Sequence, residues 1–121
     1  MKAVFNLAVP PTCLKVLLVE DNPHEAELIE DVRSGISEPQ RILLTKVERL
    51  SEAQQRLNQE TFDIILVDLS LPDSLGIETV ARVQEYAVNV PIVVLTAQND
   101  EDLALRLISL GVQDYLVKRK I

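Results

Sequence analysis

The chain is poor in cysteine and in aromatic residues, and each shortage limits what the protein can be. Its one cysteine, Cys13, excludes an internal disulfide bond. Aromatic residues make up 3% of the 121 residues and hydrophobic residues 47%, so we expect one domain with an aliphatic core. No stretch approaches the roughly 18 consecutive apolar residues of a transmembrane helix, so we expect no membrane attachment.

Basic residues are also few: Lys and Arg number 12 against 19 Asp and Glu, a formal net charge of −7. Because nucleic-acid binding depends on basic side chains that contact phosphates, this balance disfavours direct nucleic-acid binding. The N-terminal segment is short for a signal peptide and runs into Pro10-Pro11 without a cleavage site of small residues. We therefore expect residues 1–13 to be a disordered leader and the protein to be cytoplasmic.

Apolar runs alternate with amphipathic stretches, which is typical of an α/β fold with a parallel sheet. The runs predict strands at about 15–19, 42–47, 63–67, 91–95 and 115–117. The amphipathic stretches predict helices over 23–35, from a capping box at Ser51 onward, over 76–86, and from Asn99 or Asp100 to Gly111. The segment 68–75 is expected to be a loop.

The last expected strand is followed by no helix. Since an all-parallel sheet is covered on both faces, either the chain is a fragment of a longer protein or another chain supplies the cover. We favour the fragment, because cover from a partner requires an additional coincidence.

Polar side chains stand where the expected strands end. Glu20 and Asp21 follow the first strand, Asp68 ends the third, Thr96 the fourth and Lys118 the fifth. Ligands bind where the carboxyl ends of parallel strands meet, so we expect these side chains to converge there. Three carboxylates, a hydroxyl and an amine suit a divalent cation and a phosphoryl group.

Adjacent carboxylates at Glu20 and Asp21 repel each other unless a cation offsets the charge, and Mg²⁺ prefers oxygen ligands. Asp68 can act as a metal ligand or as a nucleophile, since carboxylates form acyl-phosphate intermediates. Taken singly, an acidic loop, a strand-end lysine and a threonine turn cap are ordinary surface features. Their combination favours the site. The one histidine, His24, is expected to be a surface residue rather than a phosphocarrier.

In these residues the chain resembles the receiver domain of two-component response regulators. The matching stretches are Val16–Asn22, Ile65–Asp73, Val93–Ala97 and Asp114–Lys118. The resemblance covers about Leu14 to Lys118 and implies a flavodoxin-like fold with strand order 2-1-3-4-5, so residues 14–121 would form a receiver domain truncated after its fifth strand.

The resemblance implies that Asp68 is the phosphoacceptor. A histidine kinase or histidine phosphotransfer protein would supply the phosphoryl group. Asp21 and Asp68 would ligate Mg²⁺ or Mn²⁺, with Ser70 adding its backbone carbonyl and Glu20 acting through water. The domain would then be no enzyme beyond transferring phosphoryl groups to and from its own Asp68.

The resemblance also implies a switch. Thr96 and Lys118 would bind the phosphoryl group, Ala97 would leave an open path to the acceptor, and Tyr115 would be the switch aromatic. A downstream effector domain or protein would read the fourth helix and fifth strand. One departure is Arg119, which stands where the family commonly has proline and puts a cis peptide after Lys118 in doubt.

A second departure is the absence of the family's fifth helix. We therefore expect exposed apolar surface, including some of Leu103, Leu105, Leu107 and Leu110, which would favour a homodimer. Three rival functions are considered. A dehalogenase-like phosphatase is disfavoured, because it carries a second Asp where this chain has Ser70. A flavodoxin-type cofactor binder is disfavoured, because its phosphate loop is rich in Ser, Thr and Gly, whereas Glu20 and Asp21 would repel a phosphate. The third is a degenerate receiver that acts as an interaction or dimerisation module without phosphorylation.

Overall fold

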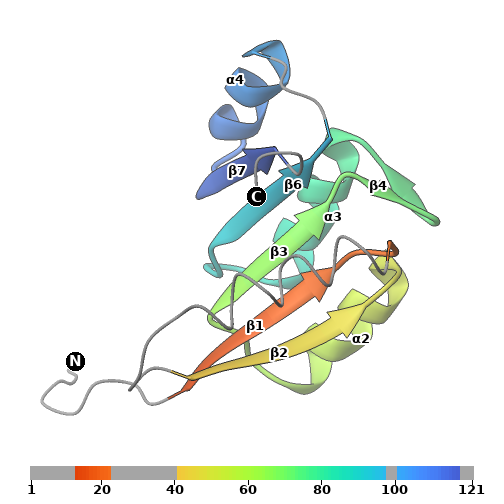
Figure 1. Ribbon diagram of the computed structural model, residues 1–121, viewed down its shortest axis with the longest axis vertical. Helices are drawn as coiled ribbons and strands as arrows, with labels where there is room; N and C mark the ends of the chain where they lie inside the picture. Colours follow the sequence, from red (N-terminus) through yellow and green to blue (C-terminus); the bar gives the residue numbers. More distant parts are fainter. Residues whose placement is uncertain (1–12, 23–40, 98–100, 118–121) are drawn as a thin grey trace, which may run out of the picture.

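A five-stranded parallel sheet forms the centre of the molecule. The computed structural model describes residues 13–22, 41–97 and 101–117. The strands follow the order β2-β1-β3-β6-β7, which is the predicted order 2-1-3-4-5 (Figure 1). Their bounds are Cys13–Val19 for β1, Arg41–Val47 for β2, Ile64–Asp68 for β3, Ile92–Thr96 for β6 and Asp114–Val117 for β7. The predicted flavodoxin-like arrangement is confirmed.

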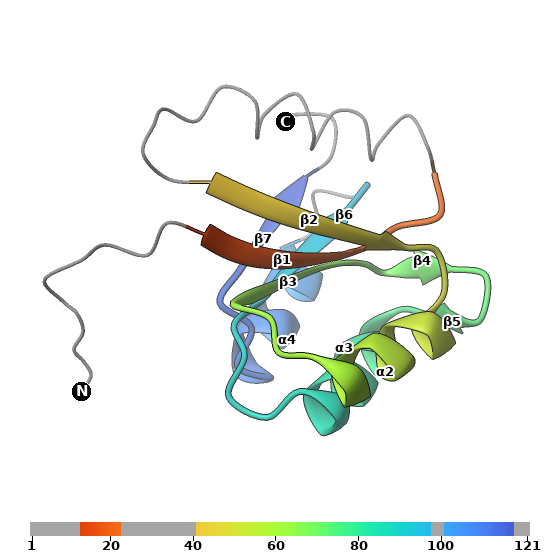
Figure 2. The ribbon, with the colours of Figure 1, turned by 90° about the horizontal axis from the view of Figure 1, so that it is seen from below.

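The three helices of the described residues lie on one face of this sheet (Figure 2). They are α2 (Leu50–Gln59), α3 (Ile77–Tyr86) and α4 (Glu101–Ser109). Strand side chains alternate between the two faces, and those that point toward the helices include Leu17, Val19, Ile65 and Val67, all fully buried. None of the described helices is long and apolar enough to cross a membrane.

The segment after β3 is a small hairpin rather than the predicted loop. Strands β4 (Ser70–Leu71) and β5 (Ser74–Leu75) pair antiparallel. The backbone N–H of Gly76 donates to the carbonyl of Leu69 at 2.7 Å, which closes the base of the hairpin. Gly76 has a φ of 72° and a ψ of −159°, a conformation almost restricted to glycine. Two-residue strands are too short to produce a readable alternation, so the sequence pattern could not predict this hairpin.

The predicted start of the second helix is also wrong. Helix α2 begins at Leu50 with Arg49 as its N-cap, not at Ser51. Glu52 accepts hydrogen bonds from the backbone N–H groups of Glu48 at 3.0 Å and Arg49 at 3.1 Å. Glu52 therefore fills the acidic half of a capping box whose N-cap is Arg49, two residues before the Ser51 of the predicted box. The other half is missing, because an arginine side chain has no acceptor.

Smaller differences concern element ends and exposed side chains. Strand β1 begins at Cys13, so it includes the last residue of the predicted leader. Among the four leucines from which we expected exposed surface, Leu105 is 68% exposed, whereas Leu107, in the same helix α4, is fully buried. The rest of the leader, the predicted helix over 23–35, His24 and the predicted caps Asn99 and Asp100 lie outside the described residues.

Candidate functional site

Three carboxylates meet at the carboxyl ends of β1 and β3. Val19 pairs with Val67 in neighbouring parallel strands, so the next residues, Glu20 and Asp68, end side by side. Glu20 is fully buried and Asp68 is 3% exposed, whereas Asp21 is exposed. One carboxylate oxygen from each of Glu20, Asp21 and Asp68 lies within 4.8 Å of the others. The structure thus brings together the acidic residues that the sequence placed at one edge.

The chemistry of these donors fits a hard divalent cation. Like charges at this separation raise one another's electrostatic energy, more so where two of the groups are shielded from water. An ion that takes oxygen ligands, such as Mg²⁺ or Mn²⁺, would offset that cost. Two backbone N–H groups hold the loop after β1 in place: Glu20 N–H donates to the carbonyl of Val47 at 2.9 Å, and Asn22 N–H donates to Glu20 Oε2 at 3.4 Å.

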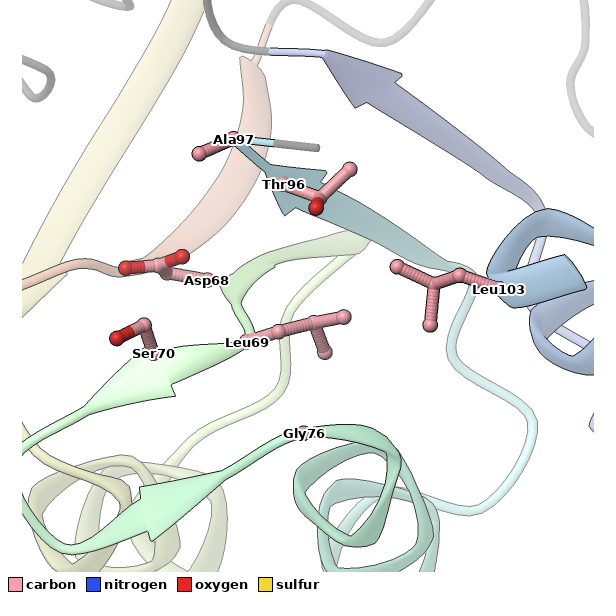
Figure 3. Close-up of a pocket in the computed structure, with 7 residues that line it drawn as sticks. All are labelled: Asp68, Leu69, Ser70, Gly76, Thr96, Ala97 and Leu103. Carbon is pink, nitrogen blue, oxygen red and sulfur yellow. The ribbon is translucent and has the colours of Figure 1, made fainter. Parts of the chain in front are cut away.

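A pocket of about 380 Å³ opens beside Asp68. Figure 3 shows Leu69 and Leu103 pointing toward each other on one side of this pocket, while Asp68 and Ser70 present oxygen atoms on the other. The remaining lining residues are Gly76, Thr96 and Ala97. The pocket therefore offers an anionic end for a cation and an adjoining apolar wall.

Thr96 and Ala97 reach this pocket from β6. Asp68 pairs with Leu95, which brings Thr96, 5% exposed, to the same edge of the sheet, and Ala97 is exposed directly after it. Ser70 lies in β4 at the rim of the pocket and is exposed. Of the residues selected from the sequence, these three join Asp68 around one cavity.

Tyr115 and Lys118 belong to the outer strand β7 and the segment after it. Tyr115 pairs with Val94 and packs half-buried against the main core cluster, on the same face as α4. Lys118 lies outside the described residues, so its place in the site stays a prediction.

The chain matches the response regulator receiver domain over residues 16–120. It belongs to that family. The receiver domain is 33% identical over 109 residues to the transcriptional regulatory protein PhoP of Escherichia coli K12. This match covers 87% of this chain and 45% of PhoP. It spans less than half the length of the curated relatives that it matches first.

Two solved structures resemble this receiver domain in fold. The phosphorylated cyanobacterial phytochrome response regulator RcpA is 30% identical, with a TM-score of 0.69 over 85% of this chain and 79% of RcpA. The Mn²⁺-bound form of response regulator Rcp1 is 25% identical, with a TM-score of 0.73 over 88% of each chain. Sequence and structure comparisons therefore agree on the family.

Sequence reasoning missed one residue next to the site. The carboxylate of Asp73, at the turn between β4 and β5, accepts the backbone N–H of Leu50 at 2.8 Å and that of Ser51 at 3.0 Å. It caps α2 from a distant part of the chain. The one hint in the sequence is the absence of an acceptor at Arg49, which shows that a cap is needed but not where it comes from.

This receiver domain should lose stability in acid partly through Asp73. Burial by itself would raise the pKa of that carboxyl, but the backbone N–H groups of Leu50 and Ser51 outweigh it and lower the pKa below its ordinary value of 3.8. The ionised form therefore stabilises the folded state fully above pH 3.8, and this contribution is lost as the pH falls through the lower folded-state pKa.

The measurement is urea unfolding of wild type and Asp73→Asn from pH 7 to pH 3. Asparagine keeps an acceptor but does not titrate. We expect a constant difference in the free energy of unfolding near neutral pH that shrinks below about pH 4, where this aspartate takes up a proton in the unfolded chain before it does so in the folded protein. A difference that stays the same down to pH 3 would show that ionisation of Asp73 adds nothing to the stability of the folded state.

Proposed function

We propose that this receiver domain accepts a phosphoryl group on Asp68 and thereby switches a downstream effector. The observation that carries the proposal is the position of Asp68: a nearly buried carboxylate grouped with two others and open to a pocket that Thr96 also lines. RcpA, which is similar to this chain, is described as phosphorylated. The donor would be a histidine kinase or a histidine phosphotransfer protein.

The transfer needs little more than correct placement. A carboxylate oxygen of Asp68 attacks the phosphorus, the bond between phosphorus and the donor's imidazole nitrogen breaks, and the nitrogen keeps the bonding electrons. The imidazole leaves neutral because its second nitrogen carries a proton and keeps it, and the product is an acyl phosphate. In this proposal Thr96 and Lys118 donate hydrogen bonds to the phosphoryl oxygens. These hydrogen bonds stabilise the charge that develops there.

A divalent cation would be held by the acidic residues of the site. Asp21 and Asp68 would ligate Mg²⁺ or Mn²⁺ directly, with the backbone carbonyl of Ser70, while Glu20 would act through water. The cation supplies neutralisation of the phosphoryl oxygens as the nucleophile approaches. The grouped carboxylate oxygens and the Mn²⁺-bound form of the similar Rcp1 support this choice.

The switch itself would involve Thr96 and Tyr115. A phosphoryl group adds about −1.5 to −2 charge, and the protein shifts to the conformation in which Thr96 binds it more tightly. Movement of Thr96 leaves space into which the half-buried Tyr115 turns, which alters α4 and β7. The partner that reads this face would be an effector, as suggested by the relative PhoP, a transcriptional regulatory protein of which this chain spans 45%.

The second candidate function is a receiver that works only as an interaction or dimerisation module. The observation in its favour is apolar surface on α4, where Leu105 is 68% and Ile108 is 60% exposed. This candidate requires no metal and no phosphoryl transfer, so one experiment separates the two.

The experiment is intact mass spectrometry after incubation with acetyl phosphate. We expect one phosphoryl adduct in the presence of Mg²⁺, none when the metal is removed with EDTA, and recovery with Mn²⁺, because three crowded carboxylates repel an incoming phosphate without a cation. No adduct in Mg²⁺ would contradict the proposal. Size-exclusion chromatography of the same samples would then show whether the chain dimerises without phosphorylation, as the second candidate requires.

A further inference from the structure

The hairpin of β4 and β5 is attached to its surroundings along its length. At its base the N–H of Gly76 donates to the carbonyl of Leu69 at 2.7 Å. On its flank the hydroxyls of Ser74 and Thr79 lie 2.8 Å apart, which joins it to α3. A hairpin with two residues in each strand has little stability of its own. Its position therefore depends on these attachments and on the one at its tip.

The attachment at the tip is the carboxylate of Asp73. It receives the first two backbone N–H groups of α2, those of Leu50 and Ser51, at 2.8 and 3.0 Å. These N–H groups have no partner within the helix, and the N-cap Arg49 offers no acceptor. A negative charge at a helix N-terminus is also favoured by the helix dipole. Asp73 thus satisfies α2 and fixes the hairpin tip with the same two hydrogen bonds.

The fixed tip bears on the site because the hairpin carries Ser70. Ser70 follows Asp68 by two residues, precedes Asp73 by three, and lines the same pocket as Asp68. The backbone on each side of Ser70 is held in place. Strand β3 fixes the chain before it, and the Asp73 anchor fixes the chain after it. Release of the anchor would leave the hairpin that carries Ser70 with the attachments at Gly76 and Thr79 but with a free tip.

We infer that Asp73 is a positioning residue for the cation site, which acts by holding the backbone of Ser70 beside Asp68. This inference rests on the proposed function, since it concerns the same site. Asp73 itself touches α2, not the acidic cluster. Asp73 therefore raises the affinity for the ion, because a hairpin that is already ordered loses less conformational entropy when the ion binds.

The test is calorimetric titration of the whole chain with Mn²⁺, without phosphodonor. We expect Asp73→Ala to weaken binding about tenfold, the size typical of residues that orient metal ligands. Asp73→Asn, which keeps one acceptor and is a good N-cap residue, should recover most of the affinity.

The matched control is Asp63→Ala. Asp63 is also an exposed aspartate whose carboxylate accepts a backbone N–H, that of Lys15 at 2.8 Å, but it precedes β3 at the opposite end of the sheet. We expect its Mn²⁺ affinity to equal that of wild type. An equal loss in Asp63→Ala would assign the effect to general destabilisation and overturn the inference.

Hydrogen exchange at the Leu50 and Ser51 amides shows whether the anchor has been released. Faster exchange at these amides in Asp73→Ala together with unchanged Mn²⁺ affinity would overturn the inference and leave the proposed function intact. Absence of Mn²⁺ binding by wild type would overturn the proposed function and, with it, the inference. If Asp73→Ala does not fold, Asp73→Ser, whose short hydroxyl reaches at most one of the two amides, is measured against the same two outcomes.

Discussion

Replacement of Asp68 by asparagine should abolish the phosphoryl adduct altogether. The amide has almost the same shape, so a side chain that is 3% exposed should still fit at the end of β3. It lacks the anionic oxygen that attacks phosphorus, and it removes one of the three carboxylates that would hold the cation. Nucleophile and charge are lost together, so no residual reaction on this residue is expected.

The measurement is intact mass after incubation with acetyl phosphate and Mg²⁺. Asp102→Asn is the matched control, because Asp102 is exposed in the first turn of α4 and lies outside the acidic cluster. It should form the adduct as wild type does. An adduct of the same size on Asp68→Asn would place the acceptor on another residue, and fragmentation of that adduct would identify it.

Truncation of Leu107 should cost a large part of the stability of the domain. Leu107 is fully buried in the core cluster between α4 and the sheet. Leucine-to-alanine changes at such positions destabilise by about 2–5 kcal/mol, because they leave a cavity that the surroundings fill only in part. Since whole domains are stable by about 5–15 kcal/mol, a change of this size is easily seen by urea unfolding.

Leu105→Ala provides the control within the same helix. Leu105 is two residues earlier in α4 and 68% exposed, and the substitution makes the same change in intrinsic helix propensity. Its free energy of unfolding should stay within about 0.5 kcal/mol of wild type. Similar losses for the two variants would contradict the packing of α4 described above.

The strands of the sheet were predictable for a simple physical reason. Helices or other segments cover both faces of a parallel sheet, so its strands appear as continuous apolar runs bounded by polar residues. The run Ile64–Val67 and the run Ile92–Leu95 are of this kind, and both are strands in the structure. The polar residue that ends each run marks the carboxyl end of the strand, which is why Asp68 and Thr96 could be predicted from the sequence.

Local details were harder to predict because they depend on contacts between distant segments. The pattern at Ser51 resembled a capping box, but α2 begins one residue earlier, where Asp73 supplies the acceptor across 23 residues of chain. The hairpin of β4 and β5 was read as a loop for a related reason, since its order comes from attachments to α2 and α3. Neither feature has a periodic signature.

Three features could be read from the order of amino acids: the fold class, the strand order implied by the family, and the acidic and hydroxyl residues at the strand ends. These depend on local composition and chain order, which a sequence states directly. The folded structure was needed to establish that Glu20 and Asp68 are buried while Asp21 is exposed, and that Leu107 faces the core while Leu105 faces solvent. It also revealed the Asp73 anchor. Burial and long-range hydrogen bonds depend on which elements pack together, and this packing exists only in the folded chain.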